Sequence, residues 1–556
     1  MTEKIKSLAR KISGQNEAAF WLALFSFFSL ILALLRDRLL AHIFGAGLLL
    51  DIYYAAFKVP DMIFVTVASL VSVSALVPLF AKKETEGEKH LKDATDSVFT
   101  IFSLLIVVFC IIAYFLIPSI SNFFFSNFDE DSLLRTIFLS RVLLLSPLLL
   151  GFSNFFGSIV QYEKRFILYS ISPLLYNAGI ILGIIFLNES LGISSAVFGV
   201  LLGAFMHLLL QASFVMFSKM KPRITVRIKW NDVLDVGKLS VPRTLALSVT
   251  TFVGFIFAVL AGRLETGSIA IFNLSWNLQS APISLIGVSF SLAAFPALAL
   301  SYAKRNMDEV VDKISQGLRQ IIFWSLPFTA FIIVLRAHIT RVVLGSGSFD
   351  WLATRLVAAS LAIFALSIVF QSTILFLSRS HYALGKTKWP FYGNILGGSI
   401  SVIIAVLFFK FFNTFENLFS TLALILKVPD LSLKILSLPF AFSLGSFFSS
   451  LILFFALGKD FVHKIWNSIR SVIFDSFVAS FVCASSIYLT LVALSDYFNL
   501  DTFFGIFGHG FVAGTVGIIL ACVYLDFINN KEYEEMKTKL IQKLETRDKK
   551  DLEFRI

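Results

Sequence analysis

The chain has 556 residues, of which 57% are hydrophobic and only 15% are charged. A soluble domain needs more polar surface than this, and a disordered chain has fewer apolar residues, so both classes are excluded for most of the sequence. The formal net charge is +11, but the basic residues lie between long apolar runs, which indicates membrane topology rather than nucleic-acid binding.

The first segment, residues 1–17, is basic and has apolar residues at helical spacing. This pattern predicts a short helix on the membrane surface. An apolar run follows over residues 18–35 and ends at Arg36-Asp37-Arg38, without a small-residue cleavage site. We interpret it as an uncleaved first span rather than a signal peptide.

The rest of the chain continues the series of apolar stretches long enough to cross a bilayer, which predicts an all-α integral membrane protein of about 14 transmembrane helices. The second and eighth stretches are too long for one straight span and contain Pro60 and Pro282, so we expect kinked or tilted helices there. The stretches are 18–35, 48–80, 97–117, 137–159, 167–187, 193–217, 239–262, 268–300, 317–335, 352–377, 390–411, 437–457, 472–494 and 503–526.

Basic and acidic loops alternate along the chain. Loops after even-numbered stretches carry Lys and Arg, whereas loops after odd-numbered stretches are acidic or neutral. Because basic residues hold loops in the cytoplasm, this alternation predicts cytoplasmic N- and C-termini. The cations that break the rule lie near the outer side, and function is expected among them: Arg36, Arg38, Arg263, Arg336, Arg341, Lys427 and Lys434.

Two segments of the chain repeat each other without gaps. GAGLLLDIYYAAFKVP begins at Gly45, and GSIAIFNLSWNLQSAP begins at Gly267, so that an offset of 222 residues also relates Pro60 to Pro282 and Asp51 to Asn273. Six spans separate the copies, which gives them the same orientation and predicts two parallel six-helix lobes. The predicted division is an N-lobe over 1–218, a basic amphipathic linker over 219–238, a C-lobe over 239–458, spans 13 and 14 over 459–527, and a charged cytoplasmic tail over 528–556.

Ionisable residues at membrane depth are costly and usually functional. Asp51 and Lys58 are seven residues apart and therefore share one helix face. Their Cα atoms would lie about 10 Å apart, too far for an ion pair, so we expect Asp51 to meet Arg36 across the first hairpin and Lys58 to face a cavity or an anion. The alternative is that Arg36, Arg38 and Lys58 extend their charges to the membrane surface.

No sequence signature of catalysis is evident. The chain shows no Ser-His-Asp set, metal-ligand cluster or P-loop, and its three cysteines lie singly in apolar runs. We therefore predict a non-enzymatic protein without a bound cofactor.

The first hairpin carries the most specific pattern in the sequence. Residues 35–60 contain LRD, then IFGAG, then Asp51, then AFKVP, and looser matches follow at 156–157, 165–166, Pro173, Asn177 and 382–390. From about residue 20 to 460 the chain closely resembles the MurJ/MviN family, lipid II flippases of the multidrug/oligosaccharidyl-lipid/polysaccharide exporter superfamily, and it has the two further spans of that family.

The resemblance implies two lobes around a cationic cavity that opens alternately to each side of the bacterial cytoplasmic membrane. The implied substrate is lipid II, the peptidoglycan precursor on a polyprenyl pyrophosphate, with coupling to the membrane potential or to a monovalent cation left open. Arg36, Asp51 and Lys58 fall on family positions, and Arg36 is the expected pyrophosphate contact because guanidinium pairs with phosphate oxygens. Asn277 stands where the family has another arginine and is the fourth substrate-binding candidate. The expected structural positions are Gly45, Gly47, Pro60 and Pro282.

The chain departs from the family at several charged positions. The family has an arginine at Leu30, an Arg-Arg pair at Phe64 and Val65, and a glutamate at Ser69. Three alternatives to lipid II transport therefore stay open. They are export of another lipid-linked oligosaccharide, a drug/cation antiporter with Asp51 as the coupling carboxylate, and a non-transporting scaffold that binds cell-wall synthesis proteins.

Overall fold

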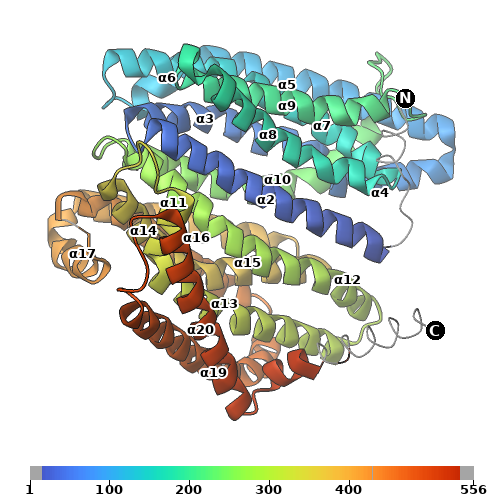
Figure 1. Ribbon diagram of the computed structural model, residues 1–556. Coiled ribbons are helices and arrows are strands. Elements are labelled where there is room, and N and C mark those ends of the chain that lie inside the picture. Colours follow the sequence, from blue (N-terminus) through green and yellow to red (C-terminus); the bar gives the residue numbers. More distant parts are fainter. Residues whose placement is uncertain (1–14, 429, 539–541, 543–556) are drawn as a thin grey trace, which may run out of the picture. The chain divides into compact units, whose positions relative to one another are not determined.

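The computed structural model describes residues 15–428, 430–538 and 542, and every regular element within these ranges is helical (Figure 1). The predicted all-helical class is thereby confirmed. The surface helix predicted within residues 1–17 rests on residues 5–12, which lie outside the described residues.

Internal packing separates the chain into two compact units. The first comprises the described residues up to Leu274 with Val343–Thr354 and Ala405–Thr414, and the second comprises Ser275–Val342, Arg355–Ile404 and the described residues from Phe415. The first unit is built mainly from α2 (Gln15–Phe44), α3 (Leu48–Thr66), α4 (Val73–Glu86), α5 (Glu88–Phe124), α6 (Glu130–Leu143), α7 (Leu145–Tyr162), α8 (Phe166–Leu191), α9 (Ser194–Val215) and α10 (Trp230–Ala261).

The second unit is built mainly from α12 (Ser289–Ala303), α13 (Met307–Val343), α15 (Ser367–Ala383), α16 (Lys388–Lys410), α17 (Phe412–Leu426), α18 (Ser437–Phe455), α19 (Lys459–Ala493) and α20 (Phe503–Phe527). Helices α11 (Ser268–Ile283) and α14 (Trp351–Ala365) have residues in both units, and so do α13, α16 and α17. Helix α10 begins at Trp230, inside the segment predicted as a linker, and α17 was not expected from the sequence. The division into two lobes stays a prediction.

The number of membrane spans is close to the expected value. Eleven helices of the described chain are long and apolar enough to cross a membrane, and the bent pair α14–α15 raises this number to twelve. All twelve coincide with predicted stretches, and the two predicted stretches outside the count are 18–35, in α2, and 48–80, in α3 and α4. Helix α3 carries Asp51, Lys58 and Asp61 within 19 residues, which makes its composition too polar for an ordinary span.

The two long spans are interrupted, although not both at their prolines. Helix α3 continues past Pro60 to Thr66, and a 3-10 turn over Ala68–Val71 separates it from α4, so the helix is interrupted six or more residues after Pro60. The hydroxyl of Thr66 donates to the carbonyl of Met62 at 2.6 Å, a back-bond that often bends helices. In the eighth span, a π-helical segment over Ser284–Val288 directly follows Pro282, as expected where a proline removes a helical donor.

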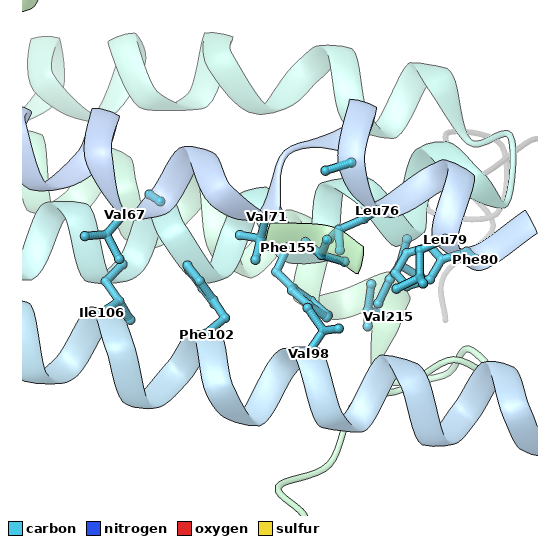
Figure 2. Packing of buried hydrophobic residues seen from close by; sticks show 14 of the residues in the cluster. Val67, Val71, Leu76, Leu79, Phe80, Val98, Phe102, Ile106, Phe155 and Val215 are labelled. Carbon is cyan, nitrogen blue, oxygen red and sulfur yellow. The ribbon is translucent and has the colours of Figure 1, made fainter. Parts of the chain in front are cut away.

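The core of the first unit is an apolar seam between the α3–α4 segment and α5 (Figure 2). Val67 and Val71 face Ile106 and Phe102, and Phe155 of α7 fills the space beside them. In a membrane such contacts are stabilised by close van der Waals packing more than by exclusion of water, since lipid is itself apolar. This seam holds α3 firmly in the unit.

Helices α8 and α9 pack through two facing GxxxG pairs. A Cβ on Gly179 would lie 2.3 Å from the Cα of Gly203, and a Cβ on Gly183 would lie 2.3 Å from the Cα of Gly199. Only glycine lets two backbones approach this closely, a device common between membrane helices. This pair forms a rigid support against which α2 packs.

In the second unit, α13, α15 and α19 share a core that includes Leu318, Phe376 and Ile465. The start of the predicted tail docks on this unit. Glu532 is buried and its Oε1 lies 3.1 Å from Nε of Arg319 on α13. Residues 531–538, at the start of the predicted charged tail, therefore form a helix that packs on this unit.

Equivalent positions of the sequence repeat have the same local structure. Gly45 and Gly267 both have positive φ, +65° and +93°, and lie three residues and one residue before the start of α3 and α11. A further match, Phe128-Asp129 with Phe349-Asp350 at an offset of 221 residues, also has a shared structure. Asp129 accepts a hydrogen bond from the amide of Ser132 at the start of α6, and Asp350 accepts one from the amide of Ala353 at the start of α14. These shared turns and caps support the repeat.

Candidate functional site

The first hairpin closes on two other loops of the first unit. Gly45 turns the chain between α2 and α3, and a Cβ there would lie 2.6 Å from the carbonyl oxygen of Ser348. The amide of Ser348 donates to the carbonyl of His42 at 2.8 Å. A Cβ on Gly267 would lie 2.1 Å from the carbonyl oxygen of Ala46. The backbone segments at 42–47, 267 and 347–348 are thus in direct contact.

Asp51 holds the start of α11. Its Oδ2 accepts a hydrogen bond from the amide of Gly267 at 2.6 Å, and its Oδ1 accepts one from the amide of Ala270 at 2.7 Å. The side chain is only 3% exposed. The first amides of a helix lack partners and carry a partial positive charge, so a buried carboxylate is well placed there. Asp51 is therefore a cap provided by another helix.

Lys58 meets the same helix about one turn further along. Its Nζ donates to Oδ1 of Asn273 at 2.9 Å, and the amide nitrogen of Asn273 donates to the carbonyl of Ile269 at 2.7 Å. The predicted shared face of Asp51 and Lys58 is confirmed, because both side chains bind α11. Asn273 is the repeat partner of Asp51, so an acid in one copy and an amide in the other both lie at this contact.

Arg36 does not meet Asp51, and that prediction is wrong. Its Nε and Nη2 lie 2.9 and 2.8 Å from Oδ1 of the neighbouring Asp37, and its Nη1 donates to Oδ1 of Asn177 on α8 at 3.1 Å. The reason is that Asp51 points toward α11, whereas Arg36 packs on the α2–α8 side of the hairpin. Its charge is half-buried and is balanced by an adjacent carboxylate.

The remaining predicted positions differ in how well the structure explains them. Pro60 is buried in α3 and Pro282 precedes the π-helical segment. Gly47 has φ −132°, and a Cβ there would meet no atom within 4 Å. Neither the space around it nor its backbone conformation explains why this residue is a glycine. Asn277 lies on α11 one turn after Asn273, in the second unit, and its carbonyl accepts a hydrogen bond from Ser280.

Sequence reasoning missed three residues of this site. Asn177 was noted only as a family match, yet it orients Arg36. Asn273 and Gly267 were recognised only as repeat partners of Asp51 and Gly45. The constant offset was the signal that could have found them, since it places a polar residue and a left-handed glycine at the start of both helices.

Comparison with known proteins identifies the family. The profile described as "Lipid II flippase MurJ" matches residues 40–508. The chain belongs to the MurJ family. A relative from Borreliella burgdorferi, "Probable lipid II flippase MurJ", is 23% identical over 381 residues, which cover 68% of this chain and 75% of that protein.

Solved structures give the same fold. The structure titled "Lipid II flippase MurJ, inward closed conformation" matches with a TM-score of 0.71 at 22% identity, over 92% of this chain and 99% of that one. An inward-facing multidrug resistance MATE family transporter of the MOP superfamily matches with a TM-score of 0.63 at 15% identity, over 79% and 95% of the two chains. A multi-pass MurJ-family membrane transporter, not an enzyme, therefore carries the Asp51 cap and the Lys58 contact.

Proposed function

We propose that this chain flips lipid II, the polyprenyl-pyrophosphate-linked precursor of peptidoglycan, across the bacterial cytoplasmic membrane. Membership of the MurJ family carries this proposal. The family profile is described as a lipid II flippase and the Borreliella burgdorferi relative as a probable lipid II flippase, and the profile match extends over most of the chain.

The α3–α11 contact provides a means of alternating access. Helices α3 and α11 are equivalent elements of the two sequence repeats, so separating them would open this end between the two predicted lobes. The contact depends on two amide–carboxylate bonds and one lysine–amide bond, all of which water can replace. We therefore assign Asp51 and Lys58 to a gate, and we place Arg36 beside it as the phosphate-binding candidate.

The same proposal fixes the orientation. Basic loops such as those with Lys82, Lys83 and Lys89 lie in the cytoplasm, as do both termini. The gate at the α2–α3 turn then faces outward. The basic cytoplasmic loops also offer a surface for cell-wall synthesis proteins, whose recruitment is part of this proposal.

For the energy source, we favour the membrane potential. The predicted seventh and eleventh spans, 239–262 and 390–411, contain no Asp or Glu, so they offer no carboxylate for a bound monovalent cation. Movement of basic residues across the field would supply about 2.3 kcal/mol per charge per 100 mV. Transport driven by an imposed potassium diffusion potential in sodium-free buffer tests this choice.

A second candidate substrate is another lipid-linked oligosaccharide. By the resemblance described above, Leu30, Phe64 and Val65 stand at positions where arginine is expected and Ser69 where glutamate is expected, and the hydroxyl of Ser69 lies 2.8 Å from that of Thr244. Arg36 is already balanced by Asp37. A less charged cavity suits a substrate with a smaller anionic group.

Complementation of a strain depleted of its own lipid II flippase tests the function. We expect wild type to restore growth and Arg36→Ala and Lys58→Ala to fail, although all are expressed in the membrane. Lys410→Ala is the matched control, because Lys410 lies over the ring of Phe411 at the end of α16 and contacts none of these residues. Failure of well-expressed wild type, with rescue of a strain lacking a different lipid-linked oligosaccharide exporter, would favour the second substrate.

A further inference from the structure

The second unit contains a large apolar cavity between α13, α15, α18 and α19, with a volume of about 1410 Å³. Its walls include Leu326, Phe370 and Ile473. Two hydroxyls of the wall donate hydrogen bonds within the protein: that of Thr329 to the carbonyl of Ala365 at 3.2 Å, and that of Ser450 to the carbonyl of Phe447 at 2.7 Å. The interior therefore suits hydrocarbon chains and not a sugar.

The rim of the cavity is basic and aromatic. Lys459, His463 and Trp466 line it from the first turns of α19, and none of the described lining residues is acidic. Within the described chain Lys459 has no ion pair, and Nε2 of His463 lies 3.2 Å from the amide nitrogen of Asn467. If that amide donates, Nδ1–H of His463 is left to donate to an anion. Tryptophan beside basic residues is typical of the headgroup level of a membrane.

The depth of the cavity equals about one leaflet. Along α13 its wall runs from Leu318 to Thr329, which at 1.5 Å per residue is about 16 Å. Along α19 the lining runs from Lys459 to Ile473, about 21 Å, of which the part from the rim residue His463 inward is about 15 Å. Half of a hydrocarbon core of about 30 Å is about 15 Å. The acyl chains of a lipid whose headgroup lies at the rim would thus end where the cavity ends.

From these three features we propose that the cavity binds an anionic phospholipid of the cytoplasmic leaflet. The phosphate lies at Lys459 and His463, and the acyl chains fill the space between α13 and α19. The leaflet follows from the orientation proposed above, but the site does not depend on which substrate is transported. The lipid joins α19, the first helix of the C-terminal pair, to the rest of the second unit.

Native mass spectrometry of the full-length protein, released from nanodiscs of phosphatidylglycerol or phosphatidylcholine, tests this site. Wild type is expected to retain one phosphatidylglycerol and little phosphatidylcholine. The double variant Lys459→Gln/His463→Gln is expected to bind phosphatidylglycerol at least about fivefold more weakly, the effect of one basic residue near an anionic lipid. Lys464→Gln is the matched control, because Lys464 lies on the same helix but pairs with Asp308 at 2.7 Å outside the cavity.

A second variant tests the apolar interior independently of charge. Thr373→Trp places a large side chain in the cavity wall and is expected to lower the occupancy by phosphatidylglycerol several-fold, with the thermal unfolding temperature in detergent used to verify folding. Equal retention of the two lipids by wild type, or unchanged retention in the double variant, would overturn the proposal. Retention of a polyprenyl phosphate in place of phospholipid would also overturn it, because the cavity would then belong to the substrate path.

Discussion

The Asp51→Asn substitution changes the gate contact with little change in size. An asparagine has one acceptor oxygen where the carboxylate has two, so only one of the amides of Gly267 and Ala270 keeps its partner. The negative charge at the start of α11 is lost as well. Hydrogen bonds to charged groups are worth about 1.5–3 kcal/mol, and a charge at a helix N-terminus about 0.3–1 kcal/mol.

Together these terms give a loss of roughly 2 kcal/mol or more, which corresponds to about a 30-fold shift toward the open contact. Hydrogen–deuterium exchange of the protein in nanodiscs measures this shift directly. Exchange follows the population of the open form, so we expect the amides of Gly267 and Ala270 to exchange about 30-fold faster in Asp51→Asn.

Asp61→Asn provides the matched control. Asp61 lies on the same helix but is exposed and makes no hydrogen bond to α11 within the described chain. The control variant should exchange like wild type at Gly267 and Ala270. Unchanged exchange in Asp51→Asn, or equal acceleration in both variants, would refute the assignment of Asp51 as the cap.

Three further predictions concern other parts of the structure. Gly267→Ala should lower the free energy of unfolding by roughly 2–4 kcal/mol, because Gly267 has a positive φ and the added Cβ would lie 2.1 Å from the carbonyl oxygen of Ala46. Gly47→Ala is the control and should leave the thermal unfolding temperature unchanged. Equal unfolding temperatures for the two variants would contradict this prediction. Glu532→Gln should accelerate hydrogen exchange across residues 531–538 by about five- to tenfold, because it leaves the largely buried charge of Arg319 on α13 without its partner. Unchanged exchange would show that the ion pair does not hold this helix in place. Hydrogen bonds from Ser132 lower the pKa of Asp129 below its ordinary value of 3.8. The ionised carboxylate therefore stabilises the start of α6 fully above about pH 3.8, and this stabilisation is lost as the pH falls through the lowered pKa. We expect exchange at the start of α6 to accelerate only below about pH 4, and Asp129→Asn, which keeps a capping side chain without the charge, to remove this dependence.

The sequence was sufficient for the spans and for part of the site. Apolar length predicted the twelve helices that the structure confirms, and a period of 3.6 residues placed Asp51 and Lys58 on one face. These features depend on local regularities, which one sequence shows directly. The break after Thr66 was missed because it lies away from Pro60, among hydroxyls that bond back to the helix.

Partners across helices were harder to predict. The sequence showed that Asp51 needs a partner, but the choice of α11 over Arg36 depends on the approach of Gly267 to Ala46, which is a tertiary contact. Arg36 was expected to meet the carboxylate of Asp51, whereas it pairs with that of the next residue, Asp37, and donates to Asn177 on α8. Similarly, the docked start of the tail depends on Arg319, more than 200 residues earlier in the chain.

Reconstituted transport is the most direct measurement of the central claim. Labelled lipid II is placed in proteoliposomes that contain the purified full-length chain, and its arrival in the opposite leaflet is followed with an impermeant reagent. We expect transport well above that of protein-free liposomes, at least tenfold slower transport by Lys58→Met, and wild-type rates for Lys410→Met. Transport no faster than in protein-free liposomes, by folded protein under an imposed membrane potential, would contradict the account.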